Sequence, residues 1–265
     1  MAFPQTRLTL IQRLADKPSQ ADWRDFMDDY WGPVCRFARG RGSLTHEDGE
    51  DVAAEVFEAI SKNRLLERWS KLRSAKLRTL ICCVARNVLS NRLRVDAGRA
   101  RLVREHGGML DRYAELGDVD AVDAPREQLD AFYAAWVDGT LRAAVESLLS
   151  EYDHAGKGDY YRVFYGRLCE QLPMAEIADH LQIKLTQAEN YYRHVRDRLG
   201  ERLKEYVREH VLRYSGAQEI VDEFTSEWSQ MGEYLRERGG LESAVRTVYE
   251  DRQNPFSLPP AQPFH

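Results

Sequence analysis

The chain has 265 residues, which is enough for two small domains or for one large domain. Hydrophobic residues account for 43% and charged residues for 31%, a balance typical of a globular protein. The formal net charge is −5, and no apolar run approaches the roughly 20 residues that a membrane-spanning helix needs. These values argue against a membrane-spanning protein and give nucleic-acid binding no support by themselves.

The first twenty residues alternate apolar and charged side chains too quickly for a signal peptide, so we expect a cytoplasmic protein. Two capping boxes then predict helix starts, because a hydroxyl and a carboxylate three residues later satisfy free backbone N–H groups. They are Ser19–Asp22 and Thr45–Asp48. Behind the second box, apolar residues recur on one face of a helix expected over 48–62: Val52, Val56, Phe57 and Ile60.

The net charge hides a strong segregation of charge along the chain. Residues 71–104 carry ten Lys and Arg against a single acid, and a helix expected over 76–94 lies inside this block. Residues 105–130 then carry eight acids against two basic residues. Basic character returns at 193–213 and acidic character at 215–251. One such block is typical of a solvated face, but two basic blocks separated by acidic stretches are harder to explain in that way.

Residues 105–126 form the predicted linker, since they combine three glycines, Pro125 and many aspartates with few large apolar side chains. Helical periodicity dominates on both sides of it, and no strand alternation is found. We therefore expect an all-α protein with a helical domain at 1–104, a second one at 127–213, and a C-terminal helical extension and tail at 214–265.

The sharpest local pattern is PMAEIADHLQIKLTQAENYYRHVRDRLGERL, residues 173–203. Small and apolar residues at 175–178 allow a second helix to cross the first closely. A short turn follows, and a capping box at Thr186–Glu189 is expected to open the next helix. Two helices joined in this way, the second rich in polar side chains at its start, predict a helix-turn-helix.

The second helix of such a motif enters the major groove, so its residues divide into two roles. Early polar side chains are expected to read bases: Gln187, Asn190, Tyr191 and His194. Arginines are expected to hold phosphates: Arg193, Arg196, Arg198 and Arg202. The alternative interpretation is a plain helical hairpin with a solvated arginine face.

A last helix is predicted from a capping box at Ser215–Gln218. One face of this helix carries an apolar stripe: Ile220, Phe224, Trp228, Met231 and Leu235. The stripe must pack on this chain, on a second copy or on a regulator, and we expect it to pack on this chain. An acidic helix folded onto basic residues would act as a brake on DNA binding. A stabilising cap on the preceding domain is the alternative.

Nothing in the sequence indicates an enzyme. His46-Glu47-Asp48 is interpreted as a capping segment, and the remaining histidines lack the spacing of metal ligands. No phosphate-binding glycine loop or nucleophile elbow is present. The cysteines show no CxxC spacing and are interpreted as small buried residues: Cys35, Cys82, Cys83 and Cys169. We expect no catalytic residues, no metal site and no cofactor.

Three segments, in order, resemble the bacterial RNA polymerase sigma factors of the extracytoplasmic-function class. EDGEDVAAEVFEAI (47–60) resembles their core-binding helix, and KLRTLICCVARNVLSNRLR (76–94) resembles the segment that engages the upstream promoter box and its melted strand. AEIADHLQIKLTQAENYYRHVRDRL (175–199) resembles the helix-turn-helix of region four. LDAFYAAWVDGTLRAAVESLLSEY (129–152) is similar to the variant described from planctomycetes.

The resemblance implies a region-two-like domain followed by a region-four-like domain in a transcription initiation factor. Such a factor binds RNA polymerase core, directs it to promoters and helps to melt promoter DNA, and an anti-sigma regulator is a further possible partner. It implies core binding by an acidic helix face: Asp51, Glu55 and Glu58. It implies promoter contacts by the basic segment: Arg78, Arg86, Asn87 and Asn91.

Two departures from the family pattern concern the helix-turn-helix. The family usually has glycine in the turn where this chain has Gln182, which costs strain if the position needs a positive φ. The family pattern also starts the recognition helix at the position of Lys184, two residues before the Thr186 cap expected here.

Two other readings remain open at this point. A stand-alone helix-turn-helix regulator would use residues 173–213 but would leave the first hundred residues without a function. A helical scaffold protein that sequesters a transcription component would need neither DNA-binding segment.

Overall fold

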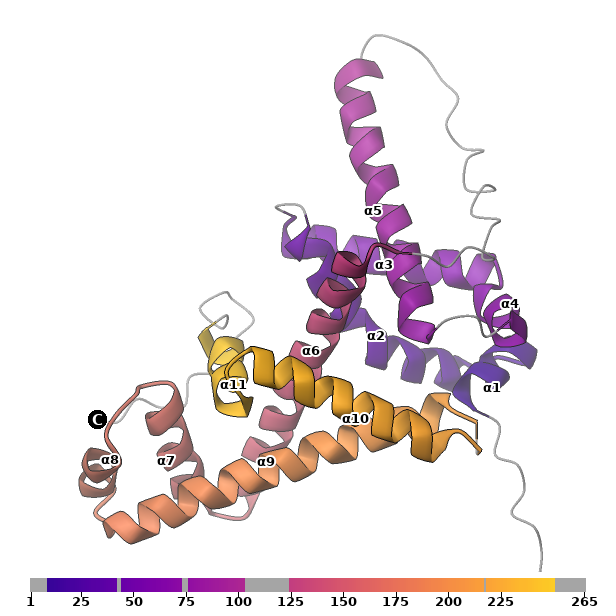
Figure 1. The fold of residues 1–265 in the computed structure, drawn as a ribbon. Coiled ribbons are helices and arrows are strands. Elements are labelled where there is room, and N and C mark those ends of the chain that lie inside the picture. The colour runs from indigo at the N-terminus through magenta and orange to yellow at the C-terminus, as the bar shows by residue number, and fades with distance from the viewer. Residues whose placement is uncertain (1–8, 42–43, 73–75, 103–123, 217, 251–265) are drawn as a thin grey trace, which may run out of the picture. The chain divides into compact units, whose positions relative to one another are not determined.

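The computed structural model describes residues 9–41, 44–72, 76–102, 124–216 and 218–250, and at 72 and 93–102 it describes the backbone alone. Within these ranges the chain forms helices and no strand, so the all-α prediction is confirmed for them (Figure 1). No helix among them is both long and apolar enough to cross a membrane. Most of the predicted linker, 105–126, lies outside the described residues.

The chain divides into two compact units, Met1–Trp136 and Val137–His265. The division falls inside one helix, α6 (Arg126–His154), and thus beyond the start expected for the second domain at 127. The first three turns of α6 pack within the first unit, and the rest of the helix packs within the second.

The described residues of the first unit form five helices before α6: α1 (Leu10–Asp16), α2 (Gln20–Gly40), α3 (His46–Lys62), α4 (Leu65–Leu72) and α5 (Leu77–Leu102). Both predicted capping boxes are confirmed, at Ser19 before α2 and at Thr45 before α3. The Thr45 hydroxyl hydrogen-bonds to Asp48 at 2.6 Å, which lowers the pKa of that carboxyl group. Helix α5 runs eight residues further than the helix expected over 76–94.

Aromatic packing between α2 and α3 forms the core of the first unit. Phe26 and Tyr30 of α2 are fully buried, and the Phe26 ring meets the Phe57 ring of α3 edge-on at 5.5 Å. The start of α6 joins this core, since Phe132 contacts Phe37 at 5.4 Å. These contacts bury the apolar face of α3 and leave its acidic face outward.

In the second unit, the part of the chain that the structure describes forms the remainder of α6 and five further helices: α7 (Gly158–Leu168), α8 (Met174–His180), α9 (Leu185–Tyr214), α10 (Ile220–Glu237) and α11 (Leu241–Glu250). Ser215 is the C-cap of α9, and α10 begins at Ile220 without a side-chain cap, so the capping box predicted at Ser215–Gln218 is wrong. The spacing of Ser215 and Gln218 fits a capping box, but Ser215 is the residue that ends α9.

The C-terminal extension packs on its own unit, as expected: α10 lies against α9, and α11 lies against α7. Met231 of α10 and Val245 of α11 are fully buried. The hydroxyl groups of Tyr161 and Tyr249 share a buried hydrogen bond of 2.8 Å between α7 and α11. The extension therefore completes the hydrophobic core of this unit, which favours the stabilising cap over the brake.

Truncating the buried anchor of the extension should destabilise the second unit. Met231→Ala removes a side chain with no exposed surface, and we expect it to lower the free energy of unfolding by about 2–5 kcal/mol. The matched control on the same helix is Val221→Ala, because Val221 is 75% exposed and should change stability by less than about 0.5 kcal/mol. Denaturant unfolding of both variants measures the difference, and equal stabilities would contradict the cap.

Candidate nucleic-acid interface

Helices α8 and α9 cross closely through two alanines. Ala178 of α8 is 2% exposed, and Ala188 of α9 is fully buried. Val163 of α7 and Ile177 of α8 complete the small core between the three helices. The Ile177 side chain packs against Gly166 of α7, where a Cβ atom would lie 3.4 Å from it. Helices α7, α8 and α9 thus pack around one small core, an arrangement compatible with the predicted helix-turn-helix.

The turn between α8 and α9 is a Schellman motif centred on Gln182. Its backbone N–H donates to the Asp179 carbonyl at 3.1 Å, and the N–H of Ile183 donates to the Ala178 carbonyl at 3.0 Å. Gln182 has φ of 54°, so the position does require the left-handed conformation that glycine adopts most cheaply. The strain expected at this position is therefore present, at about 1–2 kcal/mol.

Helix α9 begins at Leu185, with Lys184 as its N-cap, so the cap predicted at Thr186 is wrong. The backbone N–H of Lys184 donates to Oε1 of Gln187 at 3.1 Å. Gln187 was expected to read bases, but its carbonyl oxygen already closes the first turn of the helix. Its amide NH₂ group takes no part in that bond.

The predicted base readers on α9 fall on two different faces. Asn190 is exposed on the same face as Thr186 and Arg193. Tyr191 is half-buried, with its ring stacked on Tyr160 of α7 at 3.8 Å. We therefore remove Tyr191 from the predicted readers, since the stacking holds its ring against α7.

His194 is exposed but packs beside the same aromatic cluster. Its ring meets Tyr160 edge-on at 5.3 Å and lies 6.2 Å from Tyr152 of α6. Burial raises the pKa of the Tyr152 hydroxyl to about 12, so this group stays protonated at neutral pH. The aromatic cluster packs against one side of α9, and His194 lies at the edge of the exposed face of that helix.

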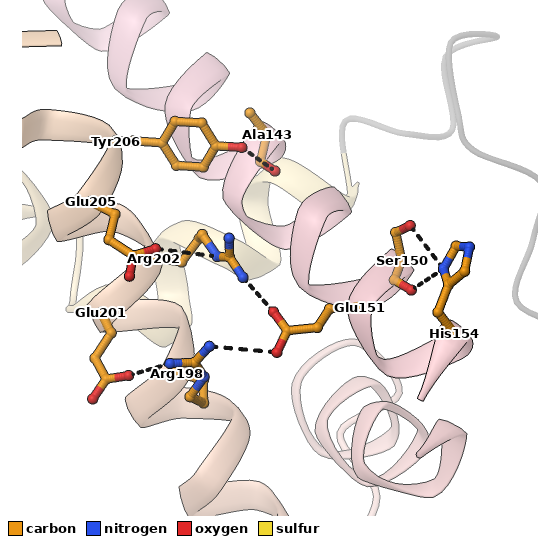
Figure 2. A network of polar contacts seen from close by, with 9 residues as sticks. All are labelled: Ala143, Ser150, Glu151, His154, Arg198, Glu201, Arg202, Glu205 and Tyr206. Atoms are coloured by element: carbon orange, nitrogen blue, oxygen red, sulfur yellow. Dashed lines mark hydrogen bonds and ion pairs between the residues drawn. The ribbon is translucent and has the colours of Figure 1, made fainter. Parts of the chain in front are cut away.

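The arginines predicted to hold phosphates also differ in their partners. Arg198 and Arg202 both reach Glu151 of α6, and Arg198 also donates to Glu201 at 2.7 Å (Figure 2). The bond to Glu201 is the main cause that raises the pKa of Arg198. These two guanidinium groups tie α9 to α6, so their assignment to phosphates is not supported.

A further contact between α6 and α9 is a hydrogen bond from the Tyr206 hydroxyl to the Ala143 carbonyl at 3.4 Å (Figure 2). Arg196 takes no part in these contacts between α6 and α9 and pairs with its neighbour Asp197 at 3.1 Å. An exposed pair of this kind is weak, so Arg196 can exchange Asp197 for a phosphate at little cost.

Arg78, a predicted promoter contact, is only 8% exposed. Its guanidinium lies 4.7 Å from the Tyr133 ring centre and 4.9 Å from that of Trp136, so two aromatic rings at the start of α6 hold it by cation–π contacts. This placement contradicts a contact between Arg78 and DNA. Its role is to fasten α6 to α5.

The remaining predicted promoter contacts lie on α5 with part of their surface exposed: Arg86, Asn87 and Asn91. Asn87 and Asn91 are one helical turn apart and share a face. The structure leaves these three as candidates.

The acidic residues of α3 have different surroundings. Glu55 accepts two hydrogen bonds from Arg92 of α5, at 2.6 and 3.0 Å, and the pairing raises the pKa of Arg92. Asp51 lies 3.8 Å from the same guanidinium but keeps 70% of its side chain exposed, and Glu58 keeps 58% exposed. Glu55 therefore serves the packing of α3 on α5, whereas Asp51 and Glu58 can meet a partner.

The sequence analysis did not identify Leu185 as part of the exposed start of α9. It is the first residue of this helix and is 46% exposed. Thr186 beside it was interpreted as a cap and is instead an exposed helical residue. The family pattern that starts the helix near Lys184 was the signal that placed both residues correctly.

No group of three potential metal ligands gathers among the described residues. All four cysteines are free thiols, and burial raises the pKa of Cys35 to about 11. No family model, curated protein or solved structure matches the chain.

Glycine should relieve the strain in the helix-turn-helix turn. Gln182→Gly removes about 1–2 kcal/mol of left-handed strain but adds backbone entropy to the unfolded chain, so we expect a net gain of up to about 1 kcal/mol. Gln182→Ala keeps a Cβ and should leave stability close to that of the wild type. Denaturant unfolding distinguishes them, and a glycine variant no more stable than the alanine variant would contradict a strained turn.

Proposed function

We propose that the chain is a transcription initiation factor that binds RNA polymerase core, directs it to specific promoters and helps to melt promoter DNA. The observation that carries the proposal is the exposed polar start of α9, held across α8 by the strained turn at Gln182. A helix presented in this way fits the major groove of B-DNA.

The electrostatics of α9 agree with a DNA-binding role despite the acidic chain. Arg193 and Arg196 are exposed along the first three turns, where they can reach bases or phosphates. Arg198 and Arg202 are held by Glu151 instead, so Arg193 and Arg196 are the arginines in the first half of the helix that remain available to DNA. This placement favours binding of DNA to the first half of α9.

The first unit supports the choice of an initiation factor over a stand-alone regulator. Helix α3 coincides with the segment that resembles the core-binding helix, and its exposed acids Asp51 and Glu58 are seven residues apart on one face. Helix α5 carries the segment that resembles the promoter-melting region. A regulator that only binds DNA would give neither helix a function.

The proposed function also assigns a role to each of the two units. The first unit would serve as the region-two-like domain and the second as the region-four-like domain, with α10 and α11 as an integral part of the latter. A helical scaffold that sequesters a transcription component would need no exposed polar face on α9.

Charge reversal on α3 tests the proposal directly. Asp51→Arg with Glu58→Arg should weaken binding of the full chain to purified bacterial RNA polymerase core by roughly tenfold or more, because like charges then oppose the docking surface. Glu55 is left unchanged because its pair with Arg92 holds α3 on α5. Affinity is measured by surface-immobilised core or by fluorescence anisotropy.

The control carries the same change of charge in the other unit: Glu233→Arg with Glu237→Arg, both exposed on α10, which should bind core as the wild type does. A wild-type chain with no affinity for core would overturn the proposed function. Undiminished binding by the α3 variant would leave the function standing and reject this docking face.

A further inference from the structure

Arg193 differs in its partner from the next three arginines along α9. Its Nη1 donates to Oδ1 of Asn190 at 3.3 Å, a neutral amide one helical turn earlier. Arg196, Arg198 and Arg202 each pair with a carboxylate instead. In the part of the chain that the structure describes, the charge of Arg193 is therefore not neutralised, while its side chain is oriented.

Arg193 also lies at the centre of the exposed face. At 3.6 residues per turn, Thr186, Asn190 and Arg193 fall within about 60° of one another around α9, whereas Arg196 stands about 90° from their mean direction. When a helix lies in the major groove, its central stripe faces the base edges and its flanks face the phosphates. The position of Arg196 therefore suits a phosphate, and that of Arg193 suits a base.

The distance along the helix is compatible with this placement. Arg193 follows Leu185, the first residue of α9, by eight residues, or about 12 Å of helix. The major groove is about 12 Å wide, so a helix that inserts its N-terminal turns keeps Arg193 within the groove. The long side chain adds further reach toward the floor of the groove.

We propose that Arg193, positioned by Asn190, is a specificity-determining residue that reads a guanine in the major groove. The inference rests on the proposed function, since it requires the second unit to bind DNA, and it replaces the phosphate role expected for Arg193. Guanine presents two acceptors, O6 and N7, that match the parallel N–H groups of a guanidinium. The bond to Asn190 uses one of the five N–H donors and leaves enough for this bidentate contact.

Asn190 acts here as a positioning residue. Its amide oxygen accepts from the guanidinium and so limits the rotamers of a long, exposed side chain before DNA arrives. A carboxylate at the position of Asn190 would compete with the acceptors of guanine for the guanidinium group of Arg193. The neutral partner orients Arg193 without neutralising it.

The test begins with selection of bound sequences from random duplex DNA by the full chain. Binding is then measured for the selected site, for the site with each guanine replaced in turn, and for 7-deazaguanine at the same positions. We expect one guanine whose loss weakens wild-type binding roughly 5- to 150-fold. Replacement of its N7 by 7-deazaguanine should weaken binding in the same direction.

Arg193→Lys distinguishes base reading from charge alone, because lysine keeps the charge but lacks the planar fork. We expect this variant to lose the preference for that guanine while the salt dependence of binding stays close to that of the wild type. Arg196→Lys is the matched control and should keep the preference. Asn190→Ala should reduce the preference without a change in thermal stability.

Three results would overturn the inference. They are an Arg193→Lys variant that keeps the full preference, a selected site without a guanine that Arg193 affects, and 7-deazaguanine that binds as well as guanine. Each of these leaves the proposed function intact if core binding and sequence selection persist. Failure of the wild type to select any sequence would overturn both proposals together.

Discussion

The close crossing of α8 and α9 is the constraint on which the rest of the second unit depends. Ala178 and Ala188 have side chains small enough for the two helices to touch, and the left-handed Gln182 turns the chain sharply enough to bring them together. A larger residue at either alanine would force the helices apart. The direction in which α9 presents its polar face follows from this crossing.

The other helices of the unit support α9 from the sides that do not face outward. Tyr160 of α7 stacks on Tyr191, Glu151 of α6 holds two arginines, and α10 covers the apolar side of the helix. Helix α9 has 30 residues, far more than the proposed groove contact requires, and its second half serves as an attachment surface for the neighbouring helices. The C-terminal extension thus contributes to holding α9 in place within the second unit.

The features that the sequence predicted well are local ones. The caps at Ser19 and Thr45 and the strained turn at Gln182 depend on hydrogen bonds between residues three to five apart, which a short motif contains in full. The all-α class followed from periodicity in the same way. A short motif is still not sufficient, because Thr186 and Ser215 fit the same capping pattern and do not start a helix. Arg78 shows a second kind of failure, because its aromatic partners lie more than fifty residues away on α6.

The candidate site was predicted in outline and not in its assignments. Side-chain type alone gave Arg193, Arg198 and Arg202 one role, but only the fold places Glu151 beside the last two and Asn190 beside the first. Glu55 was likewise chosen for its charge, and only the packing of α5 on α3 brings Arg92 against it. Partners distant in sequence decide which charged residues remain available to a ligand.

Core-dependent transcription is the measurement that tests the central claim most directly. Purified bacterial RNA polymerase core is incubated with the full chain and a pool of duplex DNA fragments, and the 5′ ends of the transcripts are mapped. The account predicts defined start sites that need both the chain and core, each preceded at a fixed distance by a sequence that the chain selects. Sequence-selective DNA binding without any such transcripts would contradict it and would indicate a stand-alone regulator.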